Sequence, residues 1–163
     1  MAMDIFLKVD SVKGESKDSK HKGEVDVLAW SWGLSNSGSA HVGGGAGAGK
    51  VNIQDLSVTK YIDFSSTALQ LACANGKHYK NALLTVRKAG EHPLEYIKIT
   101  MDEVLITSIS TGGSGGEDRL TENVTLNFAK VKVEYQKQSD STGGADGGTA
   151  TFAWDIAGNE KSG

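Results

Sequence analysis

Cysteine and proline are almost absent from this chain of 163 residues, which has one of each. A single cysteine, Cys73, cannot form an intramolecular disulfide, so the fold does not depend on an oxidising compartment. One proline against 21 glycines excludes collagen and polyproline segments and indicates many tight or mobile backbone positions. No apolar run approaches the length of about 18 residues that a membrane-spanning helix needs, so no membrane insertion is expected.

The chain also lacks an excess of basic residues. Its formal net charge is −3 and its isoelectric point is about 5.8. Proteins that follow nucleic-acid phosphates usually have a basic patch and a high isoelectric point, so nucleic-acid binding is not expected. The amino terminus, MAMDIFLK, carries a charge at Asp4 and has no apolar segment, and we therefore expect no Sec-type signal peptide.

A period of two in hydrophobicity runs along most of the chain and predicts strands. The segments with this alternation are 5–9, 25–35, 51–58, 81–88, 95–109, 123–136 and 149–156. In the second segment the largest apolar side chains share one face, which two tryptophans predict to be the core face. These side chains are Leu28, Trp30, Trp32 and Leu34. Between Phe128 and Val131 the apolar residues change parity, which predicts a bulge or a barrel corner.

One segment has a helical pattern. Ser65 and Ser66 offer an N-cap, and Asn75–Gly76 provides a stop. The apolar stripe between them consists of Leu69, Leu71, Ala72 and Cys73. We therefore predict a single all-β domain over residues 1–163, a small barrel of two packed antiparallel sheets with about seven or eight strands and one docked α-helix.

Three polar or glycine-rich stretches are predicted to lie outside the core. Residues 11–22 are polar and charged, typical of a solvated loop. Residues 36–50 include the run GGGAGAG and predict a long mobile loop, or an arm that a partner orders. Residues 137–148 predict a flexible linker before the last strand.

No pattern in the sequence predicts catalysis, a cofactor or a metal site. The segment 44–50, GGAGAGK, has the spacing of a phosphate-binding loop, but Val51 stands where magnesium needs Ser or Thr, and a strand pattern follows where a helix is required. Cys73 lies on the helical apolar stripe, where cysteine is more often a core residue than a nucleophile. The four histidines share no metal-ligand spacing: His21, His41, His78 and His92.

Several stretches of the chain together resemble one protein family. They are VKGES at 12–16, DVLAWSWG at 26–33, the glycine-rich arm to Lys50, DLS at 55–57, TKY at 59–61, Cys73 with GKHY at 76–79, and TGGSGGEDRLTENV at 111–124. On these residues the chain is similar to the haemolysin co-regulated protein (Hcp) family, the tail-tube proteins of bacterial type VI secretion systems. The resemblance runs from the amino terminus to about Tyr135.

The resemblance implies a non-enzymatic conduit. Six copies would form a ring, and rings would stack into a tube that small effector proteins travel inside. The implied partners are further copies of the chain, a contractile sheath, a spike protein and the effectors. The protein would be cytoplasmic when assembled and would leave the cell through the secretion machine, without a signal peptide.

Combined with that role, the strand pattern predicts three sets of site residues. Ala29 and Ser31 face away from the expected core face, and we expect these small neutral side chains to line the lumen. The charged group Glu117, Asp118 and Arg119 is expected at a subunit interface, or paired locally. The arm would contact a neighbouring subunit or ring through Ser39, His41, Gly43, Gly44, Gly45, Gly47, Gly49 and Lys50.

Two other function classes compete with the conduit. One is a secreted β-sandwich that binds carbohydrate or protein, or escorts an effector, without forming a tube. The other is a small hydrolase, which would need converging acid, base or nucleophile residues that the sequence does not suggest. The mass in solution separates a conduit subunit from a monomeric binding protein.

Overall fold

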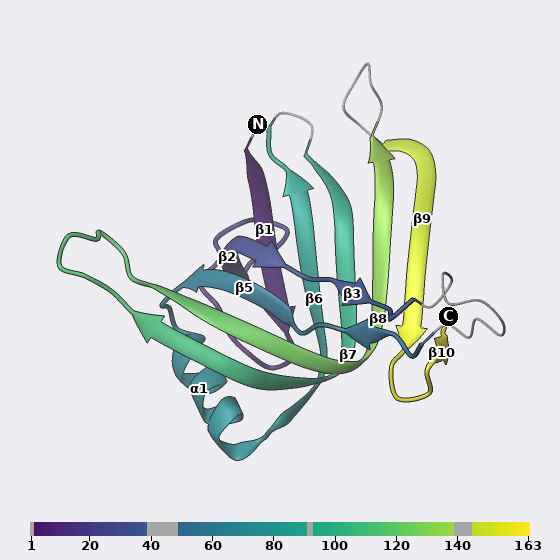
Figure 1. Ribbon diagram of the computed structural model, residues 1–163. Helices are drawn as coiled ribbons and strands as arrows, with labels where there is room; N and C mark the ends of the chain where they lie inside the picture. The colour runs from purple at the N-terminus through teal and green to yellow at the C-terminus, as the bar shows by residue number, and fades with distance from the viewer. Residues whose placement is uncertain (1, 39–48, 91–92, 139–144) are drawn as a thin grey trace, which may run out of the picture.

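The computed structural model describes residues 2–38, 49–90, 93–138 and 145–163 (Figure 1). These parts contain ten strands and one helix. The elements are β1 (Met3–Val9), β2 (Val25–Ser31), β3 (Leu34–Ser35), β4 (Asn52–Ile53), β5 (Leu56–Tyr61), α1 (Ser66–Asn75), β6 (His78–Lys88), β7 (Leu94–Gly112), β8 (Thr121–Gln138), β9 (Ala145–Asp155) and β10 (Glu160–Lys161).

Six strands close into a barrel. The sheet order is β8-β5-β2-β1-β6-β7, and β7 also pairs with β8, so the ring of strands is complete. Strands β9 and β10 extend the sheet beyond β8, while β3 and β4 form a separate two-stranded sheet. The predicted all-β fold with one helix is confirmed, although the two packed sheets belong to one continuous antiparallel sheet. The strand count exceeds the prediction because β3, β4 and β10 have only two residues each.

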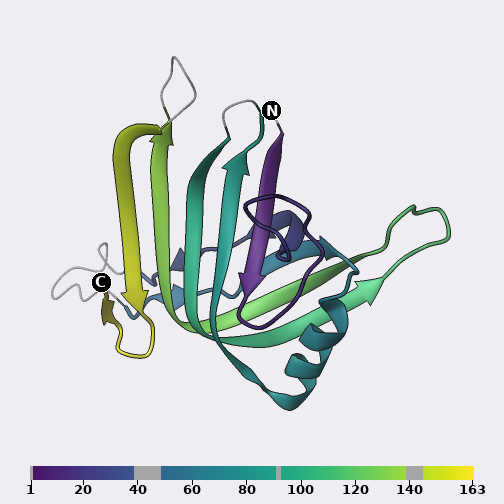
Figure 2. The same cartoon turned by 180° about the vertical axis from the view of Figure 1, so that it is seen from behind.

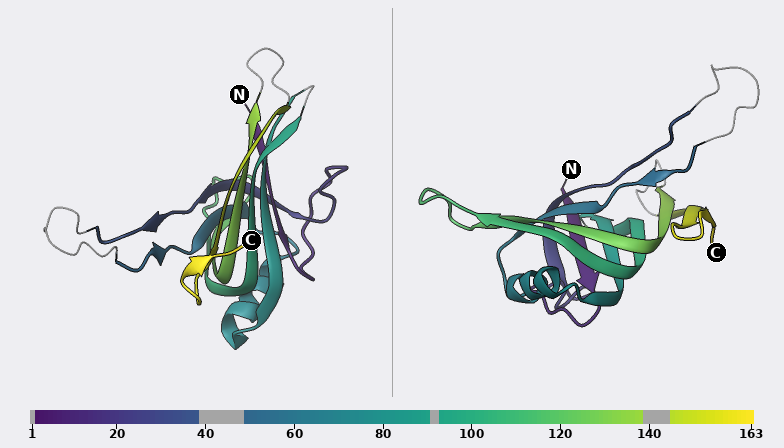
Figure 3. Two further views of the ribbon diagram at one scale, coloured as in Figure 1. Left: turned by 90° about the vertical axis from the view of Figure 1, so that its right-hand side faces the viewer. Right: turned by 60° about the horizontal axis from the view of Figure 1, so that its bottom comes forward.

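The barrel has two sides because its longest strands bend. Strands β7 and β8, with 19 and 18 residues, each run through both sides (Figures 1 and 3). The first side combines β1, β6 and β9 with one half of each long strand, and the second combines β2 and β5 with the other halves. Phe128 and Val131 are both buried, at 4% and 2% exposure, so the predicted change of parity in β8 is confirmed at this corner.

Helix α1 packs beside the barrel through Leu69 and Ala72, as its position in Figure 2 shows. Gly76 ends it in the left-handed conformation at a φ of 69°, which confirms the predicted stop. The predicted apolar stripe was wrong for Leu71, which is 63% exposed. Its place is taken by Ser66, which is buried and whose hydroxyl accepts a hydrogen bond from the Asp63 N–H.

The prediction for the core face of β2 was half wrong. The strand contains a register shift between Val27 and Ala29, and this irregularity exchanges the two faces. Val25 and Val27 are therefore buried before it, while Leu28 is 43% exposed. Beyond the shift Trp30 packs partly against the core, as does Trp32. Leu34 lies outside the barrel in β3 and is 45% exposed.

Two loop predictions also need correction. Residues 11–22 connect β1 to β2, but Ser16 and His21 are buried in that loop, so it packs on the barrel and is not fully solvated. The linker expected at 137–148 is shorter, because β8 continues to Gln138 and β9 begins at Ala145. The remaining residues of that linker, 139–144, lie outside the described parts.

Candidate functional site

Four strand segments present a face of small, uncharged side chains to the outside of the barrel. Because β2, β5, β8 and β7 lie next to one another here, their outward residues form two rows across the sheet. The first row is Ala29, Thr59, Asn123 and Ser110, and the second is Ser31, Ser57, Thr125 and Ser108. We call these eight residues the hydroxyl face. The intervening residues, such as Val58 and Val124, point into the core.

Hydrogen bonds between side chains tie the hydroxyl face together. Thr59 donates from its hydroxyl to the side-chain oxygen of Asn123 at 2.7 Å, and the Ser108 and Thr125 hydroxyls lie 2.7 Å apart. At one border, Asp55 accepts from Thr107 at 2.7 Å and from Asn127 at 2.9 Å. Many of the polar groups are thus already paired with one another, and the rows contain neither a charge nor a large apolar side chain.

Among the described residues, no strand pairs with the outer side of either edge of this four-strand region. Leu105 is the last residue of β7 that pairs with β6, so residues 107–112 are paired on the β8 side alone. On the opposite edge, Val27 is the last residue of β2 that pairs with β1, so residues 28–31 are paired with β5 alone. Unpaired backbone N–H and C=O groups at a sheet edge can pair with another chain.

The end of the β7–β8 hairpin, residues 113–120, projects away from the barrel (Figures 1 and 3). The guanidinium of Arg119 lies 3.6 Å from the centre of the Tyr61 ring, which ties the hairpin end to β5. Leu120 crosses directly over Gly113, where any Cβ would overlap with the leucine side chain. A side chain at position 113 would therefore displace the Leu120 side chain, which is 43% exposed.

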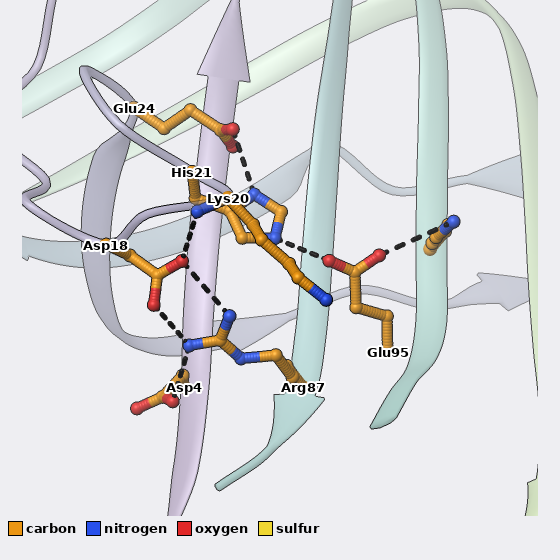
Figure 4. Close-up of polar contacts among 8 residues, drawn as sticks. Asp4, Asp18, Lys20, His21, Glu24, Arg87 and Glu95 are labelled. Carbon is orange, nitrogen blue, oxygen red and sulfur yellow. Dashed lines mark hydrogen bonds and ion pairs between the residues drawn. The ribbon is translucent and has the colours of Figure 1, made fainter. Parts of the chain in front are cut away.

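A polar cluster fixes the β1–β2 loop to the barrel wall (Figure 4). Arg87 donates to both carboxylate oxygens of Asp18, at 3.1 and 2.5 Å, and to Asp4 at 3.0 Å. The two ring nitrogens of His21 face Glu24 at 2.9 Å and Glu95 at 2.6 Å.

Phe6 contacts both halves of this cluster. Its ring stacks on the imidazole of His21 with centroids 4.3 Å apart, and the Arg87 guanidinium lies 5.0 Å from its centre. The hydrogen bonds and charge of Arg87 hold the pKa of Asp18 well below its usual range. Partial burial alone would raise the pKa of Glu95, but its contacts with His21 and Lys98 outweigh that effect and lower it.

A second ionic group is buried where α1 meets the barrel. Lys60 and Glu122 are 0% and 1% exposed and form an ion pair across β5 and β8. The Lys60 ammonium also contacts Asp63 at 3.2 Å and donates to the Ser66 hydroxyl at 3.2 Å. This group joins the start of α1 to the base of the β7–β8 hairpin.

Residues 6–135 match the family model described as "Type VI secretion system effector, Hcp". The chain belongs to the Hcp family. It is 63% identical over 163 residues to protein hcp1 of Pseudomonas aeruginosa, covering 99% of this chain and 100% of that protein. Among solved structures, Hcp1 of Salmonella typhimurium is 37% identical with a TM-score of 0.80, and a type six secretion system protein is 30% identical with a TM-score of 0.92. Each match covers 99% of this chain and 100% of the other.

Within this Hcp protein, the predicted site residues fall in different places. Ala29 and Ser31 are exposed on the hydroxyl face, away from the core as expected. Glu117, Asp118 and Arg119 are exposed at the hairpin end. Of the predicted arm, Gly49 and Lys50 are described: Gly49 accepts a hydrogen bond from Asn36 through its carbonyl, and Lys50 is exposed. The arm residues outside the described parts are Ser39, His41, Gly43, Gly44, Gly45 and Gly47.

Sequence reasoning missed most of the hydroxyl face. The signal was present, because Ser57-Val58-Thr59 and Ser108-Ile109-Ser110 alternate hydroxyl and apolar side chains. The segment 123–127 alternates polar and apolar side chains in the same way. In the described parts of the chain, no group of three or more His, Cys, Asp or Glu residues is arranged to hold a metal ion, and no helix is long and apolar enough to cross a membrane.

Proposed function

We propose that this Hcp protein is a structural subunit of the type VI secretion inner tube, in which six copies associate edge to edge into a ring and rings stack into a conduit. The observation that carries the proposal is the four-strand region whose two edges are both open. Residues 107–112 and 28–31 expose backbone groups at opposite borders of one sheet. An edge of one copy that pairs with the opposite edge of the next makes a head-to-tail contact, and such contacts close into rings when the rotation allows.

The hydroxyl face fits the wall of the conduit. When edges join around a ring, the rows that contain Ala29 and Ser31 become continuous from copy to copy. Their side chains are small and uncharged, so a passing polypeptide meets no fixed charge to form an ion pair and no apolar patch to adhere to. We therefore propose that this face lines the lumen and that small effector proteins travel along it.

The role proposed here is mechanical, without a chemical step. The sheath, the spike and the effectors remain proposed partners, as does export from the cytoplasm through the secretion machine to the exterior or a target cell. The predicted arm at 36–50 remains a proposed contact with a neighbouring subunit or ring. The β3–β4 pair at its base supports this proposed contact, because Leu34 pairs with Ile53 in a sheet separate from the barrel.

The mass in solution tests the proposal. Sedimentation equilibrium should give about six times 17.2 kDa for the purified protein. An edge variant, Ser110→Lys, places a charged side chain beside the open edge of β7 and should shift the protein toward the monomer, because charged residues block edge pairing. As a matched control, Thr151→Lys places the same exposed charge on β9. A monomeric wild-type protein would support the binding-module alternative and contradict the tube.

A further inference from the structure

In the loop between β1 and β2, three carboxylates are hydrogen-bonded to other residues, Asp10 is exposed, and the lysines point outward. Asp18 pairs with Arg87 and Glu24 with His21, while Glu15 accepts a hydrogen bond from the Phe64 N–H at 2.6 Å. The four lysines of the loop are all exposed, and within the described parts of the chain none of them forms an ion pair. These are Lys13, Lys17, Lys20 and Lys22. We call them the lysine surface.

The polar cluster of Figure 4 is what holds the loop in this orientation. Because Asp18 is bound by two nitrogens of Arg87, the backbone on both sides of it is fixed, and the Lys20 N–H donates to the same carboxylate at 3.0 Å. Asp18 and Glu24 are thereby paired within the molecule and do not pair with the neighbouring lysines. Four exposed lysines without an ion-pair partner in the described parts are thus gathered on one loop of a chain with net charge −3.

The opposite charge lies at the end of the β7–β8 hairpin. Glu117 and Asp118 are exposed there, and no ion pair or side-chain hydrogen bond of theirs is found within the described residues. Arg119, the only adjacent cation, is held against Tyr61. Figure 2 shows the end of the hairpin projecting away from the barrel, while the β1–β2 loop lies against β1.

We propose that the lysine surface of one copy receives the carboxylates of the hairpin end, Glu117 and Asp118, from a second copy. The proposal rests on the proposed function, since it names a contact within the assembly of identical subunits. Complementary charge supports it, because one chain carries both the exposed lysines and the exposed carboxylates, without ion-pair partners among the described residues, on two different loops. The contact is head-to-tail, and it orients neighbouring copies because the reverse pairing would bring like charges together.

Charge reversal tests this contact in the full-length protein. The double variant Lys17→Glu with Lys20→Glu, and the double variant Glu117→Lys with Asp118→Lys, should each raise the concentration for half-assembly by more than about ten-fold. The quadruple variant combines both reversals and should assemble close to the wild-type concentration, because attraction is restored. Lys132→Glu with Lys161→Glu makes an equal change of charge at other exposed lysines and should leave assembly unchanged.

The outcomes separate this inference from the proposed function. A wild-type protein that never associates contradicts the tube itself. Normal association of both double variants contradicts only the lysine–hairpin contact. If the lysine reversal weakens assembly but the hairpin reversal does not, the lysine surface binds another acidic group and the inference is wrong. Circular dichroism melts of all variants identify any loss of folding, and the quadruple rescue cannot arise from unfolding.

Discussion

Arg87 on β6 and Asp18 in the β1–β2 loop, 69 positions apart, form a bidentate pair in which two guanidinium nitrogens donate to two carboxylate oxygens. Such fork-to-fork pairs are stronger and more directional than single charged hydrogen bonds. The side chain of Arg87 is 10% exposed and that of Asp18 23%, so water screens the pair only in part. The loop is therefore fixed to the barrel wall at a defined point.

Replacing the fork by a single ammonium should weaken that attachment. Arg87→Lys retains the charge but loses the paired geometry and the additional bond to Asp4, and should lower the free energy of unfolding by about 1–2 kcal/mol. Urea denaturation measures the loss. Arg119→Lys, an exposed change in the stack on Tyr61, should cost less than about 1 kcal/mol. Equal losses in the two variants would contradict the special role of Arg87.

Stability should fall in acid because of the same loop. The pKa values of Asp18 and Glu95 are lowered in the folded protein, so the unfolded chain binds protons more readily at low pH. Their contribution is complete above the ordinary carboxyl pKa of about 4 and is lost as pH falls through the folded values. Thermal melts between about pH 6 and pH 2 should show this decline.

Replacing a carboxyl group by a neutral amide shows whether that group causes the decline of stability in acid. Asp18→Asn should flatten the acid side of the stability curve, because the titrating carboxylate is gone. Asp102→Asn, at an exposed position, should keep the wild-type curve. Identical acid profiles for both variants would show that other carboxylates control the decline.

Removing one member of the buried pair of Lys60 and Glu122 should destabilise the protein more than removing both. Lys60→Met leaves the Glu122 carboxylate buried without its cation and should cost about 3–5 kcal/mol. Adding Glu122→Leu removes that stranded charge and should recover most of the loss. Lys130→Met, which breaks an exposed contact of 4.0 Å, should cost less than about 1 kcal/mol in the same chemical denaturation series. A double variant that is less stable than either single variant would contradict this account.

A bulky residue on the hydroxyl face should affect cargo without affecting assembly. Ser57→Phe, in the row of Ser31 but on a strand paired on both sides, adds a large ring to a row of small side chains, so a co-expressed effector should be retained several-fold less well while the sedimentation mass stays unchanged. Co-purification measures the retained effector. Thr151→Phe, on the exposed part of β9, should retain it normally. Loss of the assembled mass in Ser57→Phe would instead assign this position to a subunit contact.

The strands were readable from sequence because their patterns are local. The parity change between Phe128 and Val131 lies within one strand, and it predicted the corner that the structure contains. The register shift in β2 between Val27 and Ala29 gives no such signal in the sequence. Val25, Val27, Leu28 and Trp30 are all apolar, so the alternation fits either face equally well, and only the pairing with β5 determines which one is buried.

The candidate site could be predicted only in part, because its residues are brought together by pairing of strands that are far apart in the sequence. Ala29 and Ser31 were found by alternation, but the rows that they begin depend on the order of β5, β8 and β7 in the sheet. The partners of the β1–β2 loop could not be predicted for the same reason. His21 reaches Glu95, 74 positions away, and nothing in the loop itself indicates that contact.

Electron micrographs of the purified, negatively stained protein test the central claim most directly. Self-association through the open edges of β2 and β7 predicts ring-shaped particles with six-fold symmetry and an open centre, some of them stacked in side view. A field of small solid particles at high protein concentration, each the size of one 17.2 kDa subunit, would contradict it.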